Sequence, residues 1–432
     1  MSEIRDQVNR TLETQAPALY AALSPLGRRM FYPPDIPVQA QEARQTTYNG
    51  TIGIFTDGAG SAVPLPSMDA VLDLSEKDRN QAFLYSPVPG FDEVRDLWAE
   101  WQREGMAEAP AICRPFASVG LAHALSIIAD LFGGEGRAVA IPTPYWGNYR
   151  QNFALRTGAV MRSAPAYQDR RYNPLAVEEA LADLPPGEPA VAMLNFPSNP
   201  GGYSPTRDER VALRDSLIRI AEQRPLVTVH DDAYNELVYE PDVPKRSFFW
   251  DMVGAHEQLI PIKVDGATKE FSFFGGRVGF LTFGLDLAPE VEAALENKLK
   301  SISRSTLGSP VATSQVILLQ ALRDGRGRSE VAAVRKIADE RYRAIRPALE
   351  ALDSELLRLL PFNSGFFVLL ELPEELGLDP HAVRRHLIEH HSTGIVSIAP
   401  RYLRLATCSV AADALPELVA RVERGVRELA GK

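Results

Sequence analysis

The sequence predicts an α/β protein with a large, mostly parallel sheet flanked by helices and a smaller α+β domain. Short aliphatic runs at 138–141, 190–194 and 226–230 alternate with helical patterns, and each run is bounded by Gly, Pro or Asp. Strands that alternate with helices favour a parallel sheet with helices on both faces. Two polar residues, Asn195 and Asp231, directly follow such runs. Because ligands bind beyond the carboxyl ends of such strands, a site is expected there.

The remaining elements divide the chain of 432 residues into three parts. Residues 1–50 are predicted to be a helical arm followed by a Pro-rich connector at 32–37, packing with the small domain. Residues 51–305 form the large domain and 306–432 the small one. The other expected elements are helices at 207–222, 289–303, 329–352 and 415–429, and strands at 365–370 and 402–406. Apolar residues recur at helical spacing in the long helices.

Composition excludes several classes of function. The net charge of −10 makes nucleic acid an improbable partner. The only cysteines, Cys113 and Cys408, argue against a disulfide framework and suit a reducing cytoplasm. The polar N-terminus lacks the apolar core of a signal peptide, and no apolar run approaches the roughly 18–20 residues that span a bilayer. His390 and His391 are interpreted as surface residues, so no metal is expected.

Four motifs carry the chemistry. Lys269 ends DGATK at 265–269, and GGRVG at 275–279 follows it. Upstream lie NFPSNPGG at 195–202 and HDDAY at 230–234. The set supplies an amide, an acid, a phenol, an amine that can form a Schiff base and an arginine. Pyridoxal 5'-phosphate (PLP) needs such a lysine, an acid for its ring nitrogen and a cationic cradle for its phosphate.

The order and spacing of these motifs resemble the class I/II aminotransferases, which are fold-type-I PLP enzymes, from about Thr51 to about Cys408. The resemblance implies that the large domain binds PLP and that Lys269 forms the Schiff base and moves the proton during transfer. It places Asp231 at the pyridine nitrogen, the alternative being a helix N-cap. Tyr234 and Asn199 would bond the phenolic oxygen, with Asn199 also near the substrate. Asn199 is otherwise a turn residue.

The phosphate is expected at a helix start within 118–125, where backbone N–H groups are free. The resemblance assigns Gly120, Leu121 and Ala122 to this loop. The side chains of Leu121 and Ala122 are apolar, so backbone amides must do the binding. Arg277 would supply the charged fork.

Three further residues, Tyr85, Thr268 and Trp146, complete the cofactor site that the resemblance implies. Tyr85 matches a tyrosine that reaches across a dimer to the partner's phosphate. Thr268 keeps one of two hydroxyls found before the lysine in many relatives, while Gly266 lacks the other. Trp146 would stack on the ring, with Tyr145 as its substitute and a core aromatic as the alternative.

Substrate binding is expected to depend on Arg404, a charged residue in the apolar strand 402–406 and a natural partner of an α-carboxylate. An outward-facing strand residue is the alternative, and Arg401 competes for the role. Gly53 resembles a glycine whose N–H lies near the substrate carboxylate, although a plain turn glycine explains it equally well. Arg304 either reads a side-chain carboxylate from the neighbouring subunit, which would favour dicarboxylic substrates, or caps the helix that ends near 303.

The sequence therefore predicts a homodimeric, PLP-dependent amino-acid aminotransferase. It would transfer an amino group from an L-amino acid to a 2-oxo acid by a ping-pong mechanism. A β-lyase or decarboxylase of the same fold is the alternative. A non-catalytic PLP sensor is disfavoured, because the segment before Thr51 is too short for a DNA-binding helix pair and has no basic cluster.

Overall fold

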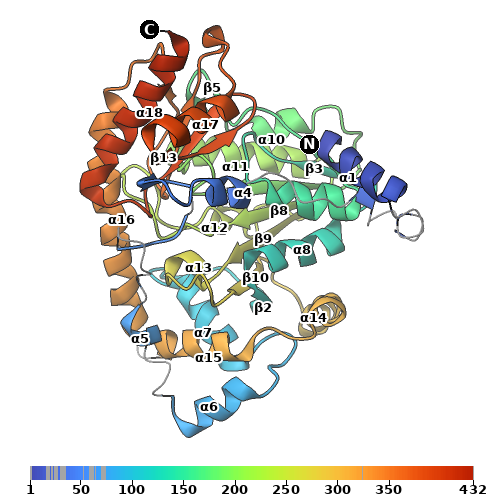
Figure 1. Cartoon of the computed structure of the whole chain (residues 1–432). Coiled ribbons are helices and arrows are strands. Elements are labelled where there is room, and N and C mark those ends of the chain that lie inside the picture. The colour runs from blue at the N-terminus through green and yellow to red at the C-terminus, as the bar shows by residue number, and fades with distance from the viewer. Residues whose placement is uncertain are drawn as a thin grey trace.

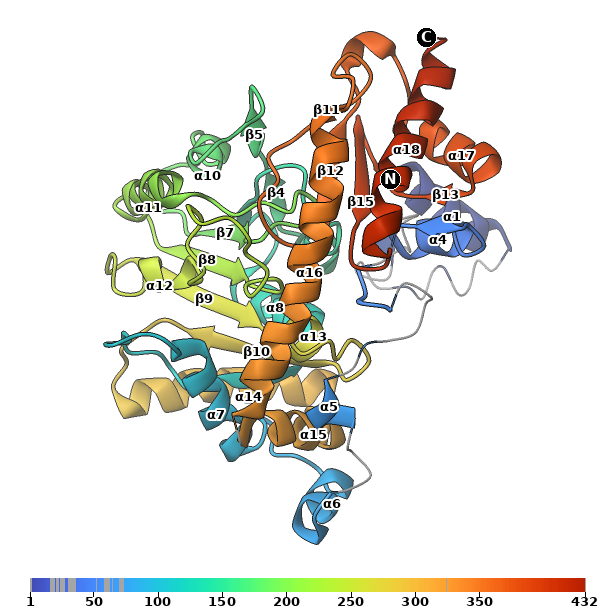
Figure 2. The same ribbon diagram turned by 90° about the vertical axis from the view of Figure 1, so that its left-hand side faces the viewer.

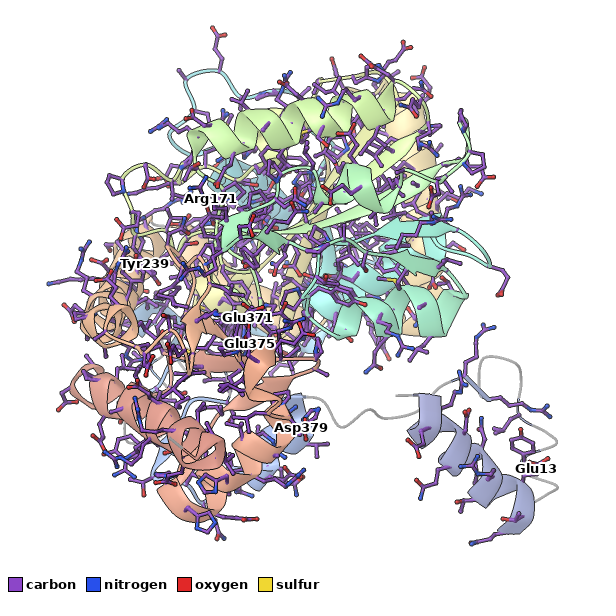
Figure 3. The ribbon with its side chains drawn as sticks, turned by 90° about the horizontal axis from the view of Figure 1, so that it is seen from above. Glu13, Arg171, Tyr239, Glu371, Glu375 and Asp379 are labelled. Atoms are coloured by element: carbon purple, nitrogen blue, oxygen red, sulfur yellow. The ribbon has the colours of Figure 1, made fainter. Side chains whose placement is uncertain are left out.

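A computed structural model describes most of the chain, namely residues 2–15, 20, 23, 28–29, 36–51, 53–57, 63, 65–69, 74–323 and 325–431. The predicted N-terminal helix is confirmed as α1 (Ser2–Gln15), which lies apart from the main body with Glu13 near one end (Figure 3). Most of the predicted connector, residues 32–35, lies outside the described residues. Its last two residues instead begin helix α4 (Ile36–Glu42).

The large domain is built on a seven-stranded sheet with the order β2-β10-β9-β8-β7-β3-β4 (Figure 1). Its strands are β2 (Phe116–Val119), β3 (Ala138–Ala140), β4 (Val160–Arg162), β7 (Ala190–Asn195), β8 (Leu226–Asp231), β9 (Leu259–Asp265) and β10 (Val278–Phe283). Strand β10 runs antiparallel to both of its neighbours, and the other pairs are parallel. The predicted mostly parallel sheet is confirmed.

Helices cover both faces of this sheet because its strand residues alternate between two cores. In β7, Val191 packs in the core that contains α8 (Gly120–Phe132), while Ala192 packs in the core that contains α11 (Arg207–Ala221). Strands buried on both faces are the expected partners of crossover helices. The other helices of this domain are α5 (Pro66–Asp69), α6 (Glu76–Phe83), α7 (Asp92–Arg103), α9 (Asn148–Arg150), α10 (Ala176–Ala180), α12 (Phe249–Met252), α13 (Ala267–Glu270) and α14 (Pro289–Thr306).

Two long helices follow α14. Helix α15 (Ala312–Arg323) packs against α6 and α7, and its Leu319 lies in the core of the large domain. Helix α16 (Arg326–Glu350) then runs from this region to the small domain (Figure 2), with Val334 in the first core and Tyr342 in the second. The domain division at residue 305 stays a prediction, and the packing places α15 with the large domain.

The small domain has an antiparallel sheet with the order β11-β12-β15-β14. Its elements are β11 (Arg358–Leu359), β12 (Phe367–Glu371), α17 (Pro380–His391), β13 (Thr393–Gly394), β14 (Val396–Ile398), β15 (Tyr402–Ala406) and α18 (Leu415–Ala430). Strand β12 begins later than predicted, because Gly365 has a φ of 67° that an extended strand cannot adopt.

The segment before the large domain contacts the small one. Strand β1 (Tyr48–Asn49) pairs with β13, and the Gln39 side chain of α4 bonds the Ser397 backbone. Within the described part of the chain, no helix is long and apolar enough to cross a membrane.

Candidate active site

A cavity of about 260 Å³ lies where β7 and β8 end. Asn195 and Asp231 are partners in the register of these strands, so their side chains start at the same sheet edge. Most of the predicted site residues line this cavity: Gly53, Leu121, Ala122, Trp146, Asn199, Asp231, Tyr234, Thr268, Lys269, Arg277 and Arg404. Residues more than 300 positions apart in the chain are thus brought together.

Lys269 lies on the short helix α13, directly after β9. Its Nζ donates a hydrogen bond to the Gly53 carbonyl at 2.9 Å and lies 4.7 Å from the centre of the Phe274 ring. Burial lowers the pKa of Lys269 to about 8, because a charged amine is poorly solvated there. A larger fraction of this amine is therefore neutral and nucleophilic near neutral pH than in an exposed lysine.

Asp231, at the end of β8, is 2% exposed. Its Oδ2 accepts a hydrogen bond from the Tyr149 hydroxyl at 2.7 Å, and its Oδ1 accepts one from the Ala233 N–H at 3.2 Å. Burial raises the pKa of Asp231 to about 6 despite these bonds. A positive charge placed beside this carboxylate would favour its ionised form.

The neighbouring Asp232 lies in a different environment. Its Oδ2 accepts a hydrogen bond from the Ser247 hydroxyl at 2.5 Å and lies 3.7 Å from Lys263 Nζ. Lys263 in turn lies 2.6 Å from Asp265 Oδ2. Asp232 therefore belongs to a buried ion network, and Asp231 alone of the two acids lines the cavity.

Arg404 enters the cavity from β15 of the small domain and is 1% exposed, so the outward-facing alternative is wrong. Its Nη1 donates to Asn199 Oδ1 at 2.9 Å, and its Nη2 donates to the Thr51 carbonyl at 2.7 Å. The guanidinium lies 4.2 Å from the centre of the Phe367 ring. Arg401, the competitor, instead pairs with the exposed Glu374 at 3.0 Å.

The start of α8 and Arg277 form a cationic corner of the cavity. Gly120 has a φ of 69°, and a Cβ built on it would lie 2.4 Å from Arg277 Nη2. Only glycine therefore lets this guanidinium reach the helix start, where Leu121 and Ala122 line the cavity. Free N–H groups at a helix start and a guanidinium together favour an anion.

Gly266 and Thr268 flank the start of α13. The Thr268 Oγ1 is buried and makes no hydrogen bond. A Cβ on Gly266 would lie 2.5 Å from the Val278 carbonyl oxygen and 2.6 Å from Gly279 Cα. Strand β10 passes too close for any side chain at this position, which is a physical reason for the missing hydroxyl.

Replacing Gly266 with alanine is expected to lower the free energy of unfolding by about 1–3 kcal/mol, the usual cost of overpacking. The atoms in the way belong to the backbone and cannot rotate aside. The measurement is the urea midpoint of the PLP-loaded protein. Gly275→Ala is the matched control, because a Cβ there meets nothing within 4 Å. Equal midpoints for the two variants would contradict the close approach.

Three aromatic rings lie at or beside the cavity wall. Trp146 lines it and contacts Tyr149 edge-on, with ring centres 5.5 Å apart. Tyr145, the substitute for Trp146, lines a smaller neighbouring cavity instead. Tyr234 lines the main cavity and is 6% exposed, and burial raises its pKa above the ordinary value.

Tyr85 and Arg304 do not line the cavity of their own chain. Tyr85 is 97% exposed, beside the exposed Phe83 and Leu84. Arg304 is exposed in the last turn of α14, a position that suits the capping alternative. The roles that would involve a partner subunit stay predictions.

Sequence reasoning placed Asn195 at this strand end without giving it a role, and it did not single out Tyr149, Ala233 or Phe367. Asn195 donates to the Asp231 carbonyl at 2.7 Å and accepts from the Asn199 N–H at 2.7 Å, so it ties the loop to the strand ends. Tyr149 holds Asp231. Asn195 lies in the motif at 195–202, and Tyr149 follows the predicted Trp146 by three residues, and these positions were the available signal. Phe367 comes from the small domain, and no spacing in the sequence points to it.

Solved structures share this fold. An aminotransferase from Anaerococcus prevotii matches with a TM-score of 0.79 and 20% identity over 92% of this chain and 98% of that one. The α-aminoadipate aminotransferase of Thermus thermophilus, solved with N-(5'-phosphopyridoxyl)-L-leucine, matches with a TM-score of 0.72 and 22% identity over 95% and 98%. The predicted fold class is confirmed.

Sequence comparisons agree with the fold. The aspartate aminotransferase of Bacillus sp. strain YM-2 is 23% identical over 331 residues, which cover 75% of this chain and 77% of that protein. The family model described as aminotransferase class I and II matches residues 51–422. The chain therefore belongs to the class I and II aminotransferases, and the predicted family, transaminase activity and PLP cofactor are confirmed.

Proposed function

We propose that this transaminase moves the amino group of an L-amino acid to a 2-oxo acid by a ping-pong mechanism, with Lys269 as the residue that joins the cofactor. The observation that carries the proposal is that a partly buried amine, Lys269, and a buried acid, Asp231, line the same cavity. Burial lowers the pKa of Lys269 and raises that of Asp231. Perturbed groups that share a cavity favour a catalytic role.

The residues present fit PLP. The Asp231 carboxylate is buried with only neutral donors bonded to it, which suits a protonated ring nitrogen. The Thr268 hydroxyl is buried without a partner, and Gly120 leaves space that Arg277 fills. The Thr268 hydroxyl and the Arg277 guanidinium beside Gly120 match an anionic phosphate, and the Asp231 carboxylate matches a cationic ring. When bound, PLP supplies an aldehyde that condenses with amines and a ring that takes up electrons from the substrate Cα.

The large domain would hold the cofactor. The α8 start at Gly120, together with Arg277 and Thr268, would bind the phosphate. Asp231, held in place by Tyr149, would keep the ring nitrogen protonated. Asn199 and Tyr234 would bond the phenolic oxygen, and Trp146 would cover one ring face.

Arg404 of the small domain would bind the substrate, and Lys269 would transfer its proton. Arg404 presents a guanidinium fork to the substrate α-carboxylate, and Asn199 and Thr51 fix its orientation. The neutral Lys269 amine would take the proton from Cα and return it to the cofactor side. The Gly53 carbonyl accepts the hydrogen bond from Lys269. A Cβ built on Gly53 would lie only 2.7 Å from the Phe367 ring.

The test of this function is a screen of L-amino acids with the purified holoenzyme. Release of a 2-oxo acid without ammonia or carbon dioxide supports transamination. Release of ammonia or carbon dioxide supports the β-lyase or decarboxylase alternative. The same screen in Arg304→Ala separates the two roles of Arg304. A selective loss on aspartate and glutamate, compared with leucine and phenylalanine, supports side-chain recognition, and an equal small loss supports capping.

We further propose that the active enzyme is a homodimer in which Tyr85 reaches the phosphate of the partner's cofactor. The near-complete exposure of Phe83 and Tyr85 in one chain supports this arrangement, since large apolar side chains exposed side by side favour an interface.

Arg404→Ala is expected to raise KM for the amino donor and to lower kcat/KM. The loss in kcat/KM should correspond to about 2–5 kcal/mol of transition-state binding, the range for removing one partner of a buried charge pair. The cofactor should stay bound, because Arg277 and Asp231 remain. Arg401→Ala, which removes a partly exposed arginine near the same strand, is the control. A kcat/KM equal to that of the control would rule out carboxylate binding by Arg404.

A further inference from the structure

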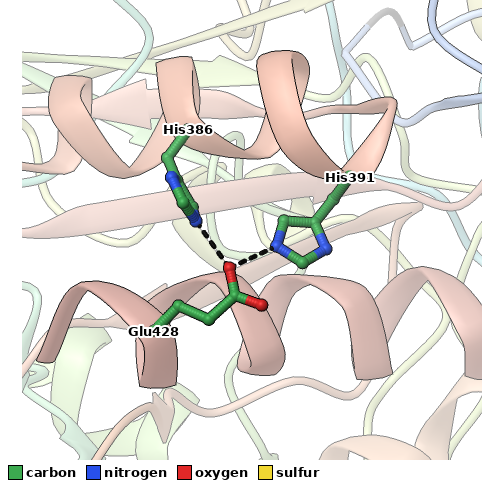
Figure 4. A group of neighbouring side chains, drawn as sticks. All are labelled: His386, His391 and Glu428. Atoms are coloured by element: carbon green, nitrogen blue, oxygen red, sulfur yellow. Dashed lines mark hydrogen bonds and ion pairs between the residues drawn. The ribbon is translucent and has the colours of Figure 1, made fainter. Parts of the chain in front are cut away.

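We propose that His386, His391 and Glu428 form a binding site for one Zn²⁺ ion that joins α17 to α18, outside the active site. Figure 4 shows both imidazoles directed at one carboxylate oxygen. The Nε2 atoms of His386 and His391 lie 2.8 and 2.9 Å from Glu428 Oε2. One ligand atom from each residue lies within 4.8 Å of the other two.

The ligand set suits zinc. Imidazole nitrogen and carboxylate oxygen are ordinary Zn²⁺ ligands, and bonds of about 2.0–2.1 Å at tetrahedral angles place ligand atoms about 3.3 Å apart. The observed separations from the Glu428 oxygen are only about 0.5 Å shorter than this. The Glu428 side chain is 46% exposed and can withdraw by that amount. Zinc would bind the Nε2 lone pairs of two neutral imidazoles, each of which would then carry its single proton on Nδ1, and water would take the fourth position.

Hydrogen bonds hold the His391 backbone in place before any ion arrives, and the His386 ring lies beside the His391 ring with centres 5.5 Å apart. His391 is 7% exposed and ends α17, where its carbonyl accepts bonds from Arg421 and Thr393 at 2.8 Å. On the facing helix, a Cβ at Gly425 would lie 2.6 Å from Leu387 Cδ2. This glycine lets α18 approach α17 one turn before Glu428. A preformed pair of imidazoles loses little side-chain entropy on binding.

Two of the three arginines that α18 contributes near the site are paired with acids: Arg421 with Glu417 at 2.8 Å, and Arg427 with Asp353 at 3.3 Å. The third, Arg424, is exposed, so water screens its charge from the site. Burial of His391 also corrects its interpretation as a surface residue. The residues that would share the ion with His391 are not its neighbour His390 but His386, five residues earlier, and Glu428 on a different helix.

The experiment is calorimetric titration of tag-free holoenzyme with ZnCl₂. Wild type should bind one Zn²⁺ per chain at this site, and His391→Ala and Glu428→Gln should each weaken that binding by at least about tenfold, a loss already typical of supporting contacts to a metal ligand. Glu389→Gln, an exposed acid on the same helix, is the matched control and should bind as wild type. Added Zn²⁺ should raise Tm in wild type and the control only. Excess Mg²⁺, which prefers oxygen ligands, should not compete.

Three results would overturn the proposal: no saturable Zn²⁺ binding by wild type, unchanged binding in both His391→Ala and Glu428→Gln, or loss of binding in His390→Ala but not in His391→Ala. The substituted residues lie outside the cavity that holds Lys269. Transaminase activity and cofactor content should therefore persist in each variant, which shows that it is folded. Glu428→Gln keeps the carboxamide oxygen as an acceptor at a half-exposed position, so it tests the site even where His391→Ala is unstable.

Discussion

Lys269→Ala is expected to leave a protein that binds PLP but does not transaminate. The variant loses the covalent link and the group that moves the proton, while Arg277 and Asp231 remain to hold the cofactor. Positioned proton transfer alone is worth about 10²–10⁴-fold in rate, so turnover should fall by at least that factor. Turnover within tenfold of wild type would rule out the role of Lys269.

Borohydride reduction of the wild-type holoenzyme, followed by peptide mass mapping, checks the same residue independently. The label is expected on Lys269 and not on Lys263, a buried lysine of the same region. Burial would lower the pKa of Lys263 as it does that of Lys269, but the carboxylates of Asp265 and Asp232 outweigh it and raise the pKa. Lys263 therefore stays charged and unreactive. A label on any lysine other than Lys269 would contradict the assignment.

The pH dependence follows from the lowered pKa of Lys269, about 8. The amine is protonated below that pH and neutral above it. The rate at which the apoenzyme forms its covalent link with added PLP should therefore rise as the pH passes through 8.

Asp231→Ala is expected to lower kcat by about 10²–10³-fold while the covalent link to PLP still forms. A carboxylate beside the ring nitrogen stabilises the charge that develops as the Cα–H bond breaks, and loss of one such electrostatic contact costs about 2.7–4 kcal/mol. Asp232→Asn is the control for a neighbouring buried acid, since Asp232 faces Lys263 and not the cavity. A wild-type kcat in Asp231→Ala would rule out the role.

The same carboxylate should make the apoprotein less stable at higher pH. The pKa of Asp231 is raised from 3.8 to about 6 by burial, so the folded state favours the protonated acid. Its stabilising contribution is complete below about pH 4 and is lost as the pH rises through 6. Above pH 6 the free energy of unfolding of apo Asp231→Asn should therefore exceed that of apo wild type by about 3 kcal/mol, because the pKa of Asp231 is raised from 3.8 to about 6. Thermal unfolding at pH 4 and pH 8 measures this difference.

The sequence by itself determined the fold class and the composition of most of the cavity. Strand and helix periodicity is local, and residues that directly follow parallel strands, such as Asn195 and Asp231, must meet at one sheet edge whatever the details of packing. Lys269 and Arg277 both lie between β9 and β10, which are neighbours in the sequence. The positions of such residues depend on the order of strands and helices, which local sequence patterns indicate.

Only the tertiary structure decided which surfaces meet across distant segments. The bond from Tyr149 to Asp231, the contact of Phe367 with Arg404 and the approach of β10 to Gly266 depend on side-chain volumes in a packed core. The placement of α15 with the large domain, and of His391 beside Glu428, has the same origin. Close packing selects these contacts from the shapes of all neighbours at once, and no spacing along a single chain specifies such complementarity.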